Sequence, residues 1–184
     1  MRQRWAALAA VAALVIAILV TTAAPAAAEN TETLLEGVTG VGEVAAGAGK
    51  VHVAALDRVV VADATGAVTG AITGLSGAMG LALSADGGRL YVALSDTAEV
   101  AEVDTGTLRI TRRVSLGSHA CPSHLTLAGD RLWVGYGCYG QWGGGVDTFD
   151  VSAASPTVTG VGGPYYSAPL VAATGACSPS APPA

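Results

Sequence analysis

The sequence predicts an all-β chain built from repeated four-stranded antiparallel units. Three segments that begin at Lys50, Arg89 and Arg131 align on one another, and their starts lie 39 and 42 positions apart. Each segment is a short apolar run rich in β-branched and aromatic residues, which is typical of a β-strand. Only 12% of the 184 residues are charged and 51% are hydrophobic. This composition favours a folded sheet protein over a disordered chain.

A repeat of about 40 residues with four strand-like pieces per unit is typical of the blades of a β-propeller. The units are predicted at residues 44–77, 78–117 and 122–163, and a fourth begins at 164–174. Closed propellers have about four to eight blades, so this number of units predicts an incomplete or open ring. The chain is then a truncated copy of a longer protein, which we favour, or copies associate through exposed blade faces to close the ring, or the chain works as an open arc.

Turn residues separate the expected strands of the first two units. In the first unit, glycine and aspartate turns separate strands at residues 43–46, 51–55, 58–62 and 68–72. In the second unit, the strands are expected at 80–83, 90–94, 99–104 and 108–116. The turn at 84–88 contains aspartate and two glycines, which tolerate positive φ. The last strand alternates charged and apolar residues, which suits an outer strand that faces solvent.

The third unit follows the same order. Its strands are expected at residues 124–128, 131–136, 145–151 and 157–161, and a further strand at 165–173 would open the fourth unit. A tail of serine, proline and alanine at 175–184 cannot pack a core.

The second unit has the most regular repeat. Residues 80–93 read Gly-Leu-Ala-Leu-Ser-Ala-Asp-Gly-Gly-Arg-Leu-Tyr-Val-Ala, and residues 99–105 read Glu-Val-Ala-Glu-Val-Asp-Thr. This segment resembles the YVTN-type β-propeller repeat of secreted and surface bacterial proteins, and the wider lactonase-like propellers are similar. The resemblance implies seven blades. The chain departs from the family pattern in its number of units and at Leu94, where the family often has asparagine.

Residues 1–28 are predicted to be a secretory signal peptide. Arg2 and Arg4 precede an apolar stretch at 5–20, and three alanines end the segment directly before Glu29. The alternative is an uncleaved membrane anchor, although the apolar stretch is short for a span of about 20 residues. We therefore expect a secreted or cell-envelope protein without a membrane span after cleavage, in which residues 29–43 lead into the repeats.

The charge of the chain argues against binding to nucleic acid or to an anionic membrane. The formal net charge is −5, and Lys50 is the single lysine. Such a chain has no basic patch to attract phosphate groups.

Two cysteines of the third unit are predicted to form a disulfide. A hairpin turn at 129–130 pairs Leu125 with Val134, and the same register places Cys121 opposite Cys138. In an exported chain, the expected product is a disulfide bond. It closes a loop whose constraint is worth about 3 kcal/mol in the chain-entropy model.

Proline cannot donate to a strand ladder, so the pairing is expected to loosen at Pro122, next to the disulfide. The alternative to the disulfide is a zinc site, although the sequence lacks C-x-x-C spacing. Its ligands would be His119, Cys121, His124 and Cys138. Cys177 in the tail is left over, either free or paired with a partner.

Propeller topology gathers certain loops on one face of the blades, and aromatic side chains on glycine-rich loops suit recognition. The candidate binding residues on that face are Asp96, His119, Tyr139, Trp142, Tyr165 and Tyr166. The alternative is that Tyr139 and Trp142 cover the rim of a blade core.

No motif for catalysis is present. The sequence lacks the G-x-S-x-G elbow of serine hydrolases, and the innermost strands offer Glu43 and His124 and little else. We predict no catalytic residue, cofactor or metal. The expected function is a binding or scaffold module at the cell surface for an unknown protein or carbohydrate. The alternatives are a lactonase-like hydrolase with most of its active site missing and a remnant without function.

Overall fold

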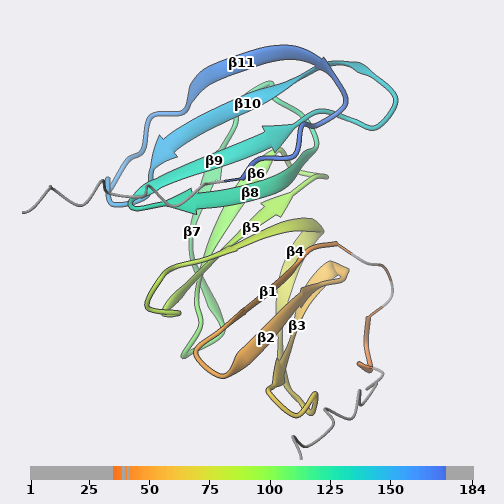
Figure 1. Cartoon of the computed structure of the whole chain (residues 1–184), viewed down its shortest axis with the longest axis vertical. Coiled ribbons are helices and arrows are strands. Elements are labelled where there is room, and N and C mark those ends of the chain that lie inside the picture. Colours follow the sequence, from red (N-terminus) through yellow and green to blue (C-terminus); the bar gives the residue numbers. More distant parts are fainter. Residues whose placement is uncertain (1–34, 39, 41, 173–184) are drawn as a thin grey trace, which may run out of the picture. The chain divides into compact units, whose positions relative to one another are not determined.

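The computed structural model describes residues 35–38, 40 and 42–172. Every described residue belongs to one compact unit. The predicted signal peptide, the predicted tail and Cys177 lie outside the described residues. The described part contains eleven strands and no α-helix (Figure 1), so the all-β prediction is confirmed. Within those residues, no helix is long and apolar enough to cross a membrane.

The strands form two antiparallel sheets. The larger sheet follows the chain order and consists of β1 (Val44–Gly47), β2 (Lys50–Ala54), β3 (Leu56–Asp63), β4 (Val68–Leu83), β5 (Arg89–Leu94), β6 (Glu99–Asp104) and β7 (Arg109–Ser115). The smaller sheet consists of β8 (Pro122–Ala128), β9 (Arg131–Tyr136), β10 (Trp142–Asp150) and β11 (Thr159–Tyr166). Short connections join the neighbouring strands, which is why each pair runs antiparallel.

Strand β4 serves two blades and joins two strands that the sequence predicts separately, at 68–72 and 80–83. Its first part pairs with β3, where Val59 faces Ile72, and its last part pairs with β5. Between the two parts, Gly77 has a φ of 71°, and a Cβ atom there would come within 2.6 Å of the main-chain nitrogen of Asp96. A glycine is therefore needed at this point. The first blade is β1 to β3 with the start of β4, the second is the end of β4 with β5 to β7, and the third is β8 to β11.

Apolar side chains fill both interfaces between blades. The cluster between the first and second blades is centred on Val59, Val61, Ile72, Leu75, Leu90, Val92 and Leu94. The cluster between the second and third blades contains Tyr91, Val100, Val114, Leu125, Leu132, Val134 and Phe149. Strand β8 lies against β4 and β5 (Figure 1). A single blade cannot bury its own faces, so stacking of the blades creates the core.

An aspartate ends the third strand of each blade and holds the turn that follows. Oδ1 of Asp63, Asp104 and Asp150 accepts hydrogen bonds from the main-chain N–H and the hydroxyl of Thr65, Thr107 and Ser152, at 2.6 to 2.8 Å. These bonds favour the ionised carboxylate and lower the pKa of each aspartate below its ordinary value.

The strand predicted at 165–173 does not form. Tyr165 and Tyr166 belong to β11, and residues 167–172 have no strand structure. This segment instead crosses the third blade, because the carbonyl of Pro169 lies over Gly135 and Ser167 lies over Gly144, where only glycine leaves room. The glycines of β9 and β10 therefore accommodate the chain as it leaves the blade.

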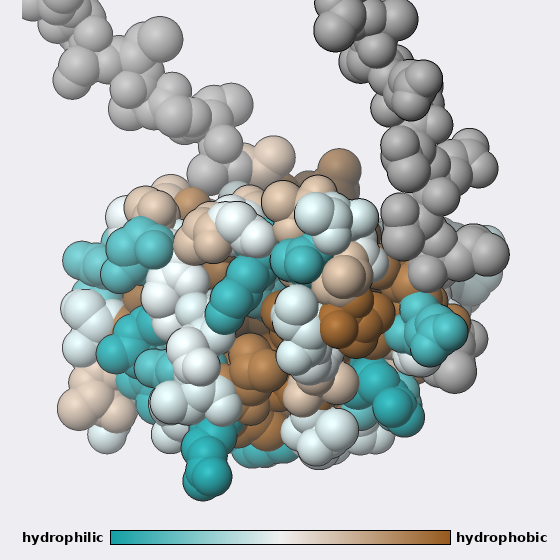
Figure 2. Space-filling view, turned by 90° about the horizontal axis from the view of Figure 1, so that it is seen from below, coloured by the Kyte–Doolittle hydropathy of each residue, from teal (hydrophilic) through white to brown (hydrophobic). Residues whose placement is uncertain are grey.

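Apolar side chains also reach the surface of the first blade. Val44, Leu56 and Val68 are 59%, 43% and 46% exposed. Figure 2 shows apolar side chains gathered in the middle of the face seen there, with polar side chains around them. Self-association through blade faces, expected from the sequence, stays a prediction.

Candidate functional site

A disulfide bond joins the two ends of the β8–β9 hairpin. Cys121 and Cys138 are bonded, and their Cα atoms lie 5.0 Å apart. Leu125 pairs with Val134 as predicted, and the register shifts at Pro122, which cannot donate to the ladder. The predicted disulfide is therefore confirmed, and the predicted register holds from His124 to Ala128. The shift at Pro122 moves Cys121 out of that register, so the ladder does not place it directly opposite Cys138.

The disulfide removes both cysteines from the alternative zinc site, since zinc binds thiolates. The two histidines of that set have carboxylate partners instead. Nδ1 of His119 lies 2.7 Å from Asp147, and Nδ1 of His124 lies 2.8 Å from Glu43. The described residues contain no group of three or more potential metal ligands.

Three exposed aromatic side chains gather beside the disulfide, and we call them the aromatic surface. Tyr139, Trp142 and Tyr166 are 97%, 76% and 59% exposed. Trp142 and Tyr166 are partners across β10 and β11, and their ring centroids lie 5.6 Å apart with the planes at 68°. The alternative was that Tyr139 and Trp142 cover the rim of a blade core. The high exposure of both side chains argues against it.

Hydrogen bonds hold the loop that carries Tyr139. The N–H of Gly140 donates to Oγ of Ser167 at 2.9 Å, and the N–H of Ser167 donates to the carbonyl of Gln141 at 2.8 Å. The Cys121–Cys138 bond fixes the start of the same loop. The aromatic surface therefore rests on a loop that is tied to the blade at two points.

Two other predicted residues lie outside this group. Tyr165 is 46% exposed and packs over Gly162 of its own strand. Asp96 lies in the β5–β6 loop of the second blade, where its carboxylate accepts a hydrogen bond of 2.8 Å from Oγ of Ser76. The structure thus gives Asp96 a role in the turn beside Gly77.

His119 forms a small polar centre of its own. Its ring stacks on Tyr136, with centroids 4.3 Å apart and planes within 2°. Its Nδ1 faces Oδ2 of Asp147, a side chain with no exposed surface. A carboxylate only accepts hydrogen bonds, so Nδ1 carries the hydrogen and Nε2 is the atom left for other contacts.

The sequence analysis missed Asp147 and Tyr136. Burial and the nearby charge of Asp147 raise the pKa of Tyr136 above its ordinary value. The pattern that could have identified Asp147 is its place in β10, two residues before Phe149, on the face that turns to the second blade. A carboxylate on an inward face needs a partner, and His119 is that partner.

Glu43 and His124, the two polar residues expected on innermost strands, bind each other. One Glu43 carboxylate oxygen contacts Nδ1 of His124 at 2.8 Å. The other oxygen accepts a hydrogen bond of 2.9 Å from the main-chain N–H of Leu81. These two contacts join the innermost strands of all three blades. The structure therefore gives Glu43 and His124 a role in holding the blades together.

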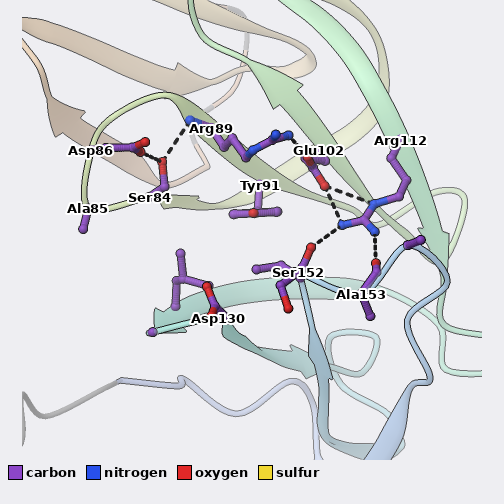
Figure 3. A pocket seen from close by; sticks show the side chains of 14 residues that line it. Ser84, Ala85, Asp86, Arg89, Tyr91, Glu102, Arg112, Asp130, Ser152 and Ala153 are labelled. Carbon is purple, nitrogen blue, oxygen red and sulfur yellow. Dashed lines mark hydrogen bonds and ion pairs between the residues drawn. The ribbon is translucent and has the colours of Figure 1, made fainter.

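A cleft of about 630 Å³ opens between the second and third blades (Figure 3). Tyr91 lies at its centre, and Arg89, Glu102 and Arg112 form one side. The Glu102 side chain is 8% exposed and forms ion pairs with Arg89 and, at 2.6 Å, with Arg112. Arg112 also reaches the third blade, where it donates to the carbonyl of Val151 at 2.8 Å.

The sequence analysis did not identify this cleft. Its residues come from the β4–β5 turn, β5, β6, β7, the end of β8 with the β8–β9 turn, and the β10–β11 connection, and only blade stacking brings them together. No short motif joins them. The cleft lies at the turns of the hairpins, whereas the aromatic surface lies at the opposite end of β9, beyond Tyr136.

Comparisons of the structure support the fold. The chain is similar to hydrazine synthase from Kuenenia stuttgartiensis, with a TM-score of 0.58 and 18% identity over 70% of this chain and 37% of that chain. It is also similar to the β-propeller domain of Cps50 (Swd1) from Myceliophteria thermophila, with a TM-score of 0.54 and 16% identity over 66% of this chain and 38% of that chain.

No protein-family model and no curated sequence matches the chain. The chain spans less than two fifths of the length of the two similar structures. Their identities are low, so the likeness concerns the fold. The strands and these similarities together define a module of β-propeller blades in an open arrangement.

Proposed function

We propose that the chain is an exported β-propeller module, with repeats of the YVTN type, that binds a protein of the cell envelope through the aromatic surface. The observation that carries the proposal is the exposure of Tyr139, Trp142 and Tyr166 on a loop held by a disulfide and hydrogen bonds. Tyrosine and tryptophan supply a large contact area at a low cost in conformational entropy. A held loop loses little further freedom when it binds.

The geometry favours a protein over a carbohydrate as the partner. The planes of Trp142 and Tyr166 stand at 68° to each other, so the two rings form a wedge. A wedge suits insertion into a pocket of a protein partner, where aromatic anchors contribute most of the binding energy. A sugar ring instead stacks on a flat aromatic face. The lactonase-like alternative has less support, because Glu43 and His124 bind each other at the innermost strands.

The proposal predicts that a photo-crosslinking residue at position 139 captures one envelope protein of the producing cell. We expect Trp142→Ala to abolish this capture, while its free energy of unfolding in urea changes by less than about 0.5 kcal/mol. Leu170→Ala is the matched control, since Leu170 is 77% exposed and Trp142 is 76% exposed. A crosslinking residue at 170 is expected to capture nothing.

Three results would contradict the proposal. These are equal capture from positions 139 and 170, a large loss of stability in Trp142→Ala, and retention on cell-wall polysaccharide that depends on Trp142. Export is tested separately by sequencing the N-terminus of the protein recovered outside the cytoplasm. Cleavage after Ala28 predicts an N-terminal Glu29, and a chain that keeps Met1 would contradict it.

A further inference from the structure

The cleft between the second and third blades is large enough for a small ligand. Its volume of about 630 Å³ lies within the ~300–1,000 Å³ range of small-molecule sites. The wall of the second blade carries Ser84, Asp86 and Arg89, and the wall of the third blade carries Asp130, Ser152 and Ala153 (Figure 3). Both walls therefore carry polar side chains among apolar ones.

One end of the cleft is closed by bonds within the protein. Arg112 donates to Glu102 through Nε at 3.0 Å and Nη2 at 2.6 Å, and its guanidinium also reaches the carbonyls of Val151 and Ala153. Four of its five N–H donors are thus used inside the protein. Arg112 and Glu102 hold the two blades together at this end, and a ligand would contact the remaining groups.

The groups that remain are a hydroxyl, two carboxylates and part of a guanidinium. Tyr91 is 3% exposed, and no hydrogen bond joins its hydroxyl or the Asp130 carboxylate to a described residue. Oδ1 of Asp86 is used by Ser84 and Gly88, which leaves Oδ2. Arg89 contacts Glu102 through Nη1, which leaves Nε and Nη2.

The cleft offers both hydrogen-bond donors and acceptors, and charges of both signs, and this mixture limits the class of ligand that it can bind. A cation would suit Asp86 and Asp130 but would face Arg89, while an anion would suit Arg89 but would face the two aspartates. A hydroxyl group both donates and accepts, so neighbouring hydroxyls can donate to the carboxylates and accept from the guanidinium at once. A neutral polyhydroxylated ring carries several such hydroxyls, so its chemistry matches the donors and the acceptors that remain.

We propose that the cleft between the second and third blades binds a neutral sugar ring, with Tyr91 and Asp130 as its central contacts. This site is independent of the aromatic surface, because the two lie at opposite ends of β9. Binding would also strengthen the contact between the blades, since the ligand touches Asp86 and Arg89 on one wall and Asp130 on the other.

The test is a titration of the full chain with glucose, galactose, mannose and N-acetylglucosamine, followed by nuclear magnetic resonance of main-chain amides. We expect at least one sugar to shift the amides of residues 84–91, 129–130 and 151–154. Tyr91→Phe removes only the hydroxyl and Asp130→Asn only the charge, and each is expected to weaken binding about tenfold. Tyr139→Phe, at the aromatic surface, is the matched control and is expected to leave the affinity unchanged.

Lysine and succinate serve as charged probes at the same concentrations. A shift of the cleft amides by either of them in preference to every sugar would overturn the proposal. So would the absence of any sugar-induced shift in a chain whose amide spectrum is that of the folded protein, or an unchanged affinity in both Tyr91→Phe and Asp130→Asn. Trp142→Ala separates the two proposals, since it is expected to abolish capture of the envelope protein and to leave sugar binding intact.

Discussion

The two interfaces between blades are built differently. The first–second interface has an apolar centre, and at its edge Nζ of Lys50 donates to the carbonyl of Thr105 at 3.0 Å. One polar side chain buried there is His52, which is 1% exposed and has no hydrogen-bond partner for either ring nitrogen among the described residues. The second–third interface has an apolar centre around Phe149, but a polar group lies at each end. Glu102 and Arg112 occupy one end, and His119 and Asp147 occupy the other.

This difference explains where the candidate sites lie. Apolar side chains can close an interface completely, because their contacts have no required direction. Buried charges need partners at defined distances. The cleft lies beside the buried Glu102 and its two arginine partners, and the third blade carries the disulfide, His119 and the aromatic surface. The first–second interface contributes to stability and carries none of these candidate sites.

The largest expected effect is loss of the disulfide, which the first two blades lack. The double substitution Cys121→Ser and Cys138→Ser should lower the free energy of unfolding by about 3 kcal/mol, because the reduced unfolded chain gains freedom. Urea unfolding with and without reductant measures this. We expect reductant to change the wild type and not the double variant. Equal midpoints for all four samples would show that the third blade does not depend on the bond.

A smaller effect is expected at the cleft. Glu102→Gln keeps the shape but removes the charge that pairs with Arg89 and Arg112, and should cost about 2 kcal/mol. The matched control is Glu99→Gln, since Glu99 pairs with Arg113 at 2.9 Å but is 27% exposed. Exposed pairs contribute about 0–1 kcal/mol. Similar losses in the two variants, measured by urea unfolding, would remove the contrast between a buried and an exposed pair.

The smallest effect is expected at the first–second interface. Burial lowers the pKa of His52 below its ordinary value of 6.5, so the folded chain keeps this ring neutral. Below pH 6.5 the unfolded chain binds a proton that the folded chain does not. This contribution to stability is therefore present above pH 6.5 and is lost as the pH falls toward the lowered pKa.

His52→Leu should remove this acid-dependent loss, which cannot exceed about 1.4 kcal/mol per pH unit for one proton. Urea midpoints of the two chains at neutral and mildly acidic pH provide the measurement. The wild type should lose more stability than the variant on acidification. Parallel pH profiles would show that His52 is not protected from solvent as its burial indicates.

Local patterns in the sequence were sufficient to predict the blades. The alternation of apolar residues, the aspartate and glycine turns and the 40-residue period identify most strands, since each depends on residues close together in the chain. The disulfide followed from the register of a single hairpin, in which Leu125 faces Val134. The prediction of a strand at 165–173 was wrong. The segment after β11 packs over glycines of β9 and β10 instead, and these glycines are distant from it in sequence.

The sequence by itself therefore determined most of the strands, their order and the Cys121–Cys138 bond, because hydrogen bonding between neighbouring strands is set by nearby residues. Only the tertiary structure decided which side chains meet between blades. Asp147 reaches His119 from 28 positions away, and Arg112 reaches Ala153 from 41 positions away. Contacts of this kind depend on how one blade packs on the next. That packing depends on side chains from every strand of both blades, so no short segment of sequence predicts it.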